Sequence, residues 1–534
     1  ASKLARENHV PVLVHVTELT QPLGHSTSGS HERYKSKERL EWERENDCNK
    51  KMRDWILSNG FSVEKDLIEI ENSIKNKVKE ARKSAWKNYQ KPIIKLREEL
   101  NVFLEDFILQ TNNEVELKIL HKDINEKTEL FYHDVINSAR KTRKILIRNG
   151  FRDIKNFKAW IKNSKDLLQI KFSSHLYSEG LNAVYRVKKV PAEYSQDAKM
   201  VDGRIILRDN FEKLLKKEDR LIIFGQDSGK IGGVNQGLEG LQKKYGEIRV
   251  SDSGIRETTI IGQGIGMALR GLKPIAEIQY LDYILYCLQI LSDDLATFSY
   301  RTKGRQISPL IIRTRGHRLE GIWHSGSPMA GMIHLLRGIH ILVPRNMTQA
   351  AGFYNTLLQA NQPAIIIECL NGYRIKEKMP SNLGEFSLPV GEIEILKPGI
   401  DITLISYGST LRIVQKVAVD LEKYEISAEV IDIQTLLPFD IKCEIKKSIE
   451  KTSRLVIIDE DMPGGGSAYI LQQLMDNQNI YQYLDTQPKL ISAKPHRPAY
   501  GEDGDYFSKP SADDIYEEVY EIMHETNPSK FPKL

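Results

Sequence analysis

The pattern of apolar and polar positions first predicts helices. Between about 60 and 180, apolar residues recur at spacings of three and four, which is typical of amphipathic helices with charged outer faces. One predicted helix carries Leu67, Ile70, Ile74, Val78, Ala81 and Ala85. A second carries Ile93, Leu96, Leu100, Phe103 and Phe107, just after Pro92, which stands at a plausible first helical position. A third should end at Asn149-Gly150.

After residue 218 the pattern changes to short, continuous apolar runs that alternate with longer helical stretches. Such runs are typical of parallel strands covered on both faces. The runs are RLIIF (220–224), PIAEI (274–278), PLIIR (309–313), IHILV (339–343) and PAIII (363–367). We therefore predict an α/β fold with a doubly wound parallel sheet.

Two further regions are predicted to contain strands outside this sheet. Residues 10–19, PVLVHVTELT, form one apolar run before a polar loop. From about 390 a smaller α/β domain begins, with DITLISYG, ISAEVIDIQTL and RLVIIDED as its strands.

Composition fits a globular protein of several domains. The chain has 534 residues, 28% of them charged, and a formal net charge of +5. No apolar run is long enough to span a bilayer, and the first residues lack the apolar core of a secretory signal, so we expect no membrane association. The four cysteines stand far apart, which suits reduced thiols in a cytoplasmic protein.

The positive charge is concentrated in the helical segment. Residues 61–180 contain 24 basic and 18 acidic residues. A basic segment can attract nucleic acid, but the interleaved acids dilute any stripe that could follow phosphates. We therefore expect a solvated helical surface and no nucleic-acid partner.

One acidic residue stands where α/β proteins bind ligands. Glu257 follows a short predicted strand and precedes a glycine-bearing helix, so its carboxylate should lie at the carboxyl edge of the parallel sheet. Burial among Ile255, Ile260 and Ile261 would favour its protonated form. An acid in a first helical turn can equally well serve the helix dipole alone. The pattern leaves both interpretations open.

The region from 218 to 534 resembles a known family. Its features run in order: glycines around Asp227 in GQDSGKIGG, then KKYGEIRVSD, the Glu257 block, GLKPIAEIQYLDY and His324-Ser325. Residues 386 onward add EILKPGIDITLISYG and RLVIIDEDMPGGG. Together these resemble the beta subunit of the thiamine-diphosphate-dependent decarboxylating component of 2-oxo acid dehydrogenase complexes.

Residues 10–45 resemble the late part of the family's alpha subunit, with a histidine-serine loop at His25 and Ser26. The alpha half of the family uses a G-D-G motif, followed about thirty residues later by Asn-Asn, for metal and diphosphate; the sequence contains no G-D-G, so this combined motif does not occur. We therefore expect the chain to be the C-terminal portion of a longer fused polypeptide, with the Mg²⁺ ligands in the missing half.

The resemblance implies roles for six residues. Glu257 would hydrogen-bond the aminopyrimidine of thiamine diphosphate and so promote loss of the thiazolium proton. Catalytic roles are also implied for His324, in acyl transfer to a lipoyl group, and for His25, near the diphosphate. The cofactor pocket would be lined by Tyr283, Ile255 and Gln279.

The implied domains are an alpha-like tail (1–58), a charged helical linker (59–185), a pyrimidine-binding domain (186–385) and a transketolase-like C-terminal domain (386–534). The implied reaction is oxidative decarboxylation of a 2-oxo acid of the pyruvate or branched-chain type. HSTS at 25–28 favours the branched-chain type. The implied partners are a lipoyl-bearing dihydrolipoyl acyltransferase and a second fused chain, giving a dimer.

Two alternatives stay open at this point. A transketolase or a deoxyxylulose-phosphate-synthase-like enzyme would use the same cofactor and the same carboxylate. A protein of another class, a scaffold or nucleic-acid-binding protein, would act through residues 60–180 and need no catalysis.

Overall fold

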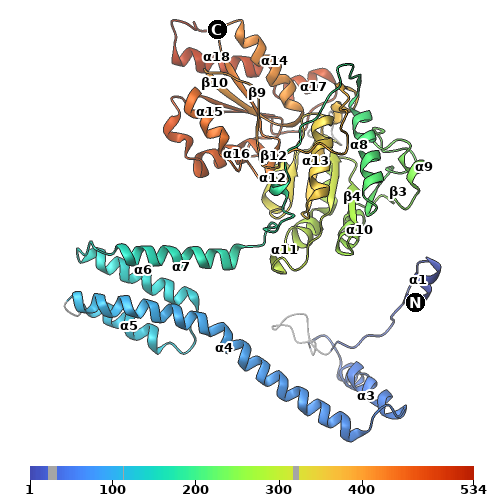
Figure 1. Cartoon of the computed structure of the whole chain (residues 1–534), viewed down its shortest axis with the longest axis vertical. Helices are drawn as coiled ribbons and strands as arrows, with labels where there is room; N and C mark the ends of the chain where they lie inside the picture. The colour runs from blue at the N-terminus through green and yellow to red at the C-terminus, as the bar shows by residue number, and fades with distance from the viewer. Residues whose placement is uncertain (22–32, 112–113, 317–323) are drawn as a thin grey trace. The chain divides into compact units, whose positions relative to one another are not determined.

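The computed structural model describes residues 1–21, 33–111, 114–316 and 324–534. The chain divides into two compact units, 1–168 and 169–534. Figure 1 shows helices in the first unit and two sheets flanked by helices in the second. The predicted fold class, an α/β protein preceded by a helical segment, is confirmed.

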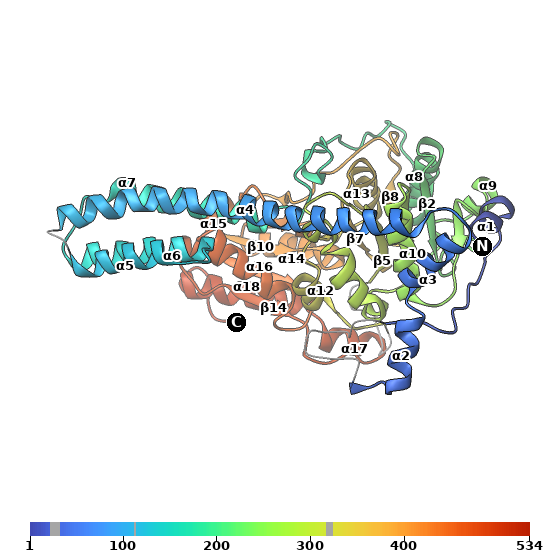
Figure 2. The same ribbon diagram turned by 90° about the horizontal axis from the view of Figure 1, so that it is seen from below.

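The first unit is built from helices. They are α1 (Ser2–Asn8), α2 (Lys37–Glu45), α3 (Cys48–Ser58), α4 (Glu64–Gln110), α5 (Val115–Glu126), α6 (Tyr132–Arg148) and α7 (Lys155–Ser173), which extends past residue 168. Apolar stripes of α4 to α7 meet in one buried cluster that includes Leu100, Phe107 and Phe157. Figure 2 shows these helices lying side by side.

The expected break before Pro92 is wrong. Helix α4 runs without interruption from Glu64 to Gln110, with Pro92 inside it. Proline removes one helical hydrogen bond and costs about 3 kcal/mol in a helix interior. The neighbouring Ile93 and Leu100 are completely buried against the other helices, and this burial offsets the cost.

The strand expected at residues 10–19 does not form. These residues have no regular secondary structure, and Leu13 and Val14 are 91% and 66% exposed. A strand needs a neighbour for its backbone hydrogen bonds, and none of the described residues pairs with this segment. The apolar run alone therefore does not produce a strand.

The second unit contains a seven-stranded sheet in the order β12-β6-β7-β5-β4-β2-β3. All neighbours pair in parallel except β12, which pairs antiparallel with β6. The strands are β2 (Leu221–Gly225), β3 (Val250–Asp252), β4 (Lys273–Glu277), β5 (Ile311–Arg315), β6 (His340–Leu342), β7 (Ala364–Glu368) and β12 (Thr435–Leu437).

Helices cover both faces of this sheet, as continuous apolar strands require. Alternate strand residues enter different cores: Ile311 packs on one face and Ile312 on the other. One face is covered by α8 (Gly203–Lys217) and α13 (Met347–Gln359). The other is covered by α10 (Glu257–Leu269), η3 (Leu281–Cys287), η4 (Ile290–Leu295) and α12 (Met329–Leu335).

A five-stranded sheet follows in the order β14-β13-β10-β11-β9, with only β9 antiparallel to its neighbour. Its strands are β9 (Glu394–Lys397), β10 (Ile402–Ser406), β11 (Ala428–Asp432), β13 (Leu455–Asp459) and β14 (Lys489–Ser492). Its helices are α14 (Leu411–Glu422), α15 (Glu444–Thr452), α16 (Gly466–Gln472), α17 (Gly501–Ser508) and α18 (Ala512–Thr526). Strands of both sheets contribute to one apolar cluster, which joins the two domains.

The unit also contains smaller elements. Strand β1 (Met200–Asp202) pairs with β8 (Lys376–Lys378), and the short helices are η2 (Val184–Arg186), α9 (Leu241–Tyr245), α11 (Phe298–Arg301), η5 (Leu370–Arg374), η6 (Gly408–Thr410), η7 (Gln473–Asn477) and η8 (Ile480–Tyr483). Within the described ranges, no helix combines the length and the apolar character that crossing a bilayer requires.

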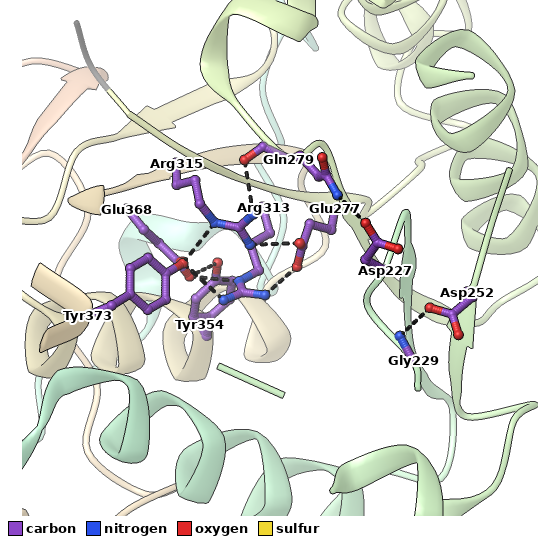
Figure 3. Close-up of polar contacts among 10 residues, drawn as sticks. All are labelled: Asp227, Gly229, Asp252, Glu277, Gln279, Arg313, Arg315, Tyr354, Glu368 and Tyr373. Atoms are coloured by element: carbon purple, nitrogen blue, oxygen red, sulfur yellow. Dashed lines mark hydrogen bonds and ion pairs between the residues drawn. The ribbon is translucent and has the colours of Figure 1, made fainter. Parts of the chain in front are cut away.

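A buried charge network lies among strands β4, β5 and β7 (Figure 3). Its four charged members, Glu277, Arg313, Arg315 and Glu368, are fully buried. Arg313 binds both carboxylates, and Arg315 donates to Glu277 at 2.7 Å. Burial alone would raise the pKa of Glu277, but Arg315 and Arg313 outweigh it and hold that pKa below its usual value. Glu277 is therefore ionised beside the two guanidinium groups.

We predict that Glu277→Gln destabilises the second unit strongly, because it leaves a buried guanidinium without its counter-charge. The expected loss in the free energy of unfolding is about 3–5 kcal/mol. Glu212→Gln makes the same chemical change in the exposed pair with Lys244 and should cost less than about 1 kcal/mol. Urea denaturation of both variants tests this, and equal losses would contradict it.

A second prediction concerns His340, at the start of β6. Burial lowers its pKa to about 4, and Gln362 and Leu437 offset this only in part. In the unfolded chain the histidine has a pKa of about 6.5. Between about pH 4 and about 6.5 the unfolded chain therefore binds more protons at this residue than the folded chain does. Stability should fall as the pH drops from about 6.5 towards 4, by up to about 3 kcal/mol from this group.

His340→Gln should remove this part of the pH dependence, whatever its effect on stability at neutral pH. His334→Gln changes an exposed histidine of α12 and should leave the dependence as in the wild type. Melting temperatures between pH 7 and 5 check the prediction, which is refuted if the His340→Gln curve keeps the wild-type slope.

Candidate active site

The candidate site lies at the carboxyl edge of the seven-stranded sheet. Strands β2, β3, β4 and β5 are parallel, so the segments that follow them emerge on the same side. These segments carry Asp227, Glu257, Gln279 and Tyr283. The fold thus gathers residues that are up to 56 positions apart in the sequence.

Glu257 is the first residue of α10 and is 9% exposed. None of the described residues donates a hydrogen bond to its carboxylate or forms an ion pair with it. Its position in the first turn is favourable for an anion, because backbone N–H groups and the helix dipole point there. A buried carboxylate with open lone pairs is also available to a ligand.

Tyr283 lies beside this carboxylate. Burial raises its pKa, and the neighbouring Tyr280 and Glu257 raise it further. The hydroxyl of Thr258 donates to the carbonyl of Tyr286 at 2.5 Å, which ties the start of α10 to η3. Burial also raises the pKa of Cys287 to about 12, with a contribution from Glu257, so this thiol is protonated and inert.

His324 belongs to an aromatic group with two tyrosines. Its ring stacks on Tyr280 with centroids 4.3 Å apart and meets the edge of Tyr283 at 5.5 Å. Its Nδ1 atom is buried and has no hydrogen-bond partner among the described residues. The imidazole is thus oriented by stacking and keeps a ring nitrogen free for a ligand.

A side chain at Gly326, two positions after His324, would displace the Asp282 carboxylate. The Gly326 N–H donates to Asp282 at 2.8 Å, and a Cβ at Gly326 would lie 2.0 Å from the same carboxylate. Asp282 also contacts Arg497 at 3.4 Å. Sequence reasoning missed Tyr280 and Asp282, although both belong to the aromatic run YLDYILY and could have been suspected from it.

Gln279 joins the site to the buried charge network (Figure 3). Its amide donates to Asp227 at 2.8 Å, and its carbonyl accepts from Arg315 at 3.0 Å. The Asp227 carbonyl accepts in turn from the Gly233 N–H at 2.7 Å. Gln279 therefore fixes the loop after β2. Ile255, which is also predicted to line the cofactor pocket, is 74% exposed. A role of either residue in lining a cofactor pocket stays a prediction.

One expected site residue, His25, falls outside the described part of the chain, so its predicted role is not assessed. Across the described part of the chain, no three His, Cys, Asp or Glu side chains cluster so that they could bind a metal ion.

The arrangement around Glu257 fits half of the implied cofactor. An aminopyrimidine is flat and offers a ring nitrogen, so it suits a buried carboxylate without a partner beside tyrosine rings. Glu257, Tyr283 and His324 could contact such a ring from three segments of the chain.

Two domain families match the second unit. Residues 199–375 match the family described as "Transketolase, pyrimidine binding domain", and residues 391–509 match "Transketolase, C-terminal domain". The first match contains Glu257, Tyr283 and His324.

Curated relatives match about half of the chain. The chain is 30% identical over 279 residues to "Pyruvate dehydrogenase E1 component subunit beta" of Acholeplasma laidlawii, covering 52% of this chain and 84% of that protein. The identity is 32% over 264 residues to the protein of the same name from Bacillus subtilis (49% and 80%). It is 33% over 256 residues to that of Staphylococcus epidermidis (48% and 78%).

The strands, the two domain matches and the relatives all agree with the motifs around Glu257. The chain belongs to the family of beta subunits of the thiamine-diphosphate-dependent decarboxylating component of 2-oxo acid dehydrogenases.

Proposed function

We propose that this chain takes part in the oxidative decarboxylation of a 2-oxo acid and passes the acyl group to a lipoyl-bearing acyltransferase. The observation that carries the proposal is the Glu257 carboxylate, which is buried at a helix start and has no partner among the described residues. A buried carboxylate with a purely structural role would be expected to accept hydrogen bonds or to pair with a cation.

The residues of this chain would bind the aminopyrimidine half of thiamine diphosphate. Glu257 would accept a hydrogen bond from the protonated ring nitrogen, and Tyr283 would pack against the ring. When bound, the cofactor supplies an acidic thiazolium carbon that adds to the 2-oxo carbonyl and accepts the electrons released on decarboxylation. Glu257 would hold the proton at the pyrimidine ring, and η3 with its apolar neighbours would exclude water.

His324 would act in the later acyl transfer. Stacking on Tyr280 holds the imidazole in one plane, and its buried Nδ1 has no hydrogen-bond partner among the described residues. Histidine can donate a proton near neutral pH, which a thiolate formed from the lipoyl group would require. His25, Mg²⁺ and the diphosphate contacts remain expectations outside these residues.

Pyruvate is the substrate that we favour over a branched-chain acid, since the relatives cited above are named pyruvate dehydrogenase components. We also propose a paired assembly that docks a dihydrolipoyl acyltransferase, because the relatives are named as one component of a larger enzyme. This assignment opposes the branched-chain preference drawn from HSTS at 25–28.

Glu257→Gln in the full-length protein should slow hydrogen–deuterium exchange at the thiazolium carbon of added thiamine diphosphate. We expect a loss of about 10²–10⁴-fold, the usual contribution of a positioned acid–base group. Glu502→Gln, in the exposed first turn of α17, should leave the exchange unchanged. Calorimetric titration of the cofactor separates lost catalysis from lost binding. Exchange at the wild-type rate in Glu257→Gln would refute the role.

His324→Asn should separate two steps of the reaction. Acylation of a free lipoyl domain should fall by about 10²-fold or more, while decarboxylation measured with an artificial electron acceptor should fall much less. His334→Asn provides the matched control, since that side chain is exposed on α12. Equal losses in the two assays would mean that His324 has only a structural role.

A further inference from the structure

The long helix α4 carries one apolar stripe along its whole length. Starting at Leu67, apolar side chains recur at intervals of three, four and four residues, which is an 11-residue repeat. The stripe consists of Leu67, Ile70, Ile74, Val78, Ala81, Ala85, Tyr89, Pro92, Leu96, Leu100, Phe103 and Phe107. At 3.67 residues per turn, such a stripe follows one side of a nearly straight helix.

The two halves of this stripe have different surroundings. In the C-terminal half, Leu100 and Phe107 are buried in the cluster formed with α5, α6 and α7. In the N-terminal half, Ile70, Ile74 and Val78 are 57%, 50% and 62% exposed. Figure 1 shows this half extending beyond the other helices of the bundle. The uncovered part, residues 64–89, is about 39 Å long.

An exposed apolar stripe of this length needs a partner. Isolated helices are marginal in water, and their stability in proteins comes mainly from packing of the apolar face. Contiguous exposed apolar surface also marks interaction sites. The C-terminal half of the stripe already packs against α5, α6 and α7. The N-terminal half continues the same pattern of apolar residues, which is the pattern of a helix–helix interface.

The charges of α4 point to a second copy of the same helix as the partner. Residues 64–71 contain four acidic residues and one basic residue, whereas residues 75–91 contain seven basic residues and one acidic residue. Two copies in parallel would place like charges side by side. Two copies in antiparallel order that cross near residue 78 place the acidic start of each, residues 64–71, beside residues 84–91 of the other, which contain Lys87 and Lys91 and no acidic residue.

Side-chain sizes agree with one antiparallel register. If the two helices cross between Lys77 and Val78, Ile70 of one copy lies opposite Ala85 of the other, and Ile74 lies opposite Ala81. Large residues then face small ones, as close packing of two helices requires.

Charged residues beside the stripe fit the same register. Glu71 and Arg82 lie on one flank of the stripe and would meet across the pair. Asp66 and Lys91 would meet on the other flank. Glu71 already forms an ion pair with Arg53 of α3 in its own chain, at 3.2 Å. In the pair it would accept hydrogen bonds from Arg53 and from Arg82 of the second copy. Lys77 would lie near its own copy, where its long side chain can extend into solvent.

We propose that residues 64–89 of α4 form an antiparallel coiled coil with the same segment of a second chain. This interface is independent of the proposed catalytic role, since none of its residues belongs to the candidate active site.

Disulfide cross-linking of the full-length protein tests both the partner and the direction. The background is Cys48→Ser with Cys443→Ser, because these two cysteines are exposed. Val78→Cys should form a disulfide-linked dimer, since the two copies of this position meet at the centre of the pair. Lys83→Cys, on the opposite face of α4, is the matched control and should give at least about tenfold less dimer, because its copies face away from each other.

The direction follows from two further variants. Ile70→Cys alone should not cross-link in the antiparallel register, whereas Ile70→Cys with Ala85→Cys should. Cross-linking of Ile70→Cys alone would indicate a parallel pair and overturn the proposal. No dimer with Val78→Cys or with the double variant would show that something else, such as another part of the same chain, covers the stripe, and would also overturn it.

Discussion

The pairing of two guanidinium groups with two carboxylates inside the sheet is the constraint on which the second unit depends. Charges removed from water must be paired and hydrogen-bonded, since an unpaired buried charge costs several kcal/mol. Arg313 and Arg315 on β5 meet this requirement only when β4 supplies Glu277 and β7 supplies Glu368 on either side. Tyr354 and Tyr373 donate to Glu368 and complete the network. The network therefore specifies which strands are neighbours.

The buried charge network is connected to the candidate site by hydrogen bonds of Gln279. Arg315 holds the Gln279 carbonyl, and the Gln279 amide holds Asp227 in the loop after β2. The site thus rests on a rigid, fully satisfied polar network. Glu257 shows the opposite condition, since it is buried and none of the described residues donates a hydrogen bond to its carboxylate or forms an ion pair with it.

In the first unit, burial of apolar side chains is the interaction that overrides local preferences of the chain. Helix α4 tolerates Pro92 because its C-terminal half buries a wide apolar stripe. The local rule that proline ends a helix failed there because packing energy exceeds the cost of one lost hydrogen bond. In residues 10–19 the local rule failed for the converse reason: an apolar run has strand propensity, but no described segment supplies the second strand.

The sequence by itself determined the α/β class, most of the parallel strands of both sheets and the helical segment before them, because continuous apolar runs and three-four spacings follow directly from which faces are buried. It also pointed to Glu257 through the order strand, acid, helix. It did not indicate β14, which pairs in parallel with β13. Only the tertiary structure decided that His324 stacks on Tyr280 and that Gln279 binds Asp227. These contacts join segments far apart in the chain and depend on which strands become neighbours, which a local pattern does not encode.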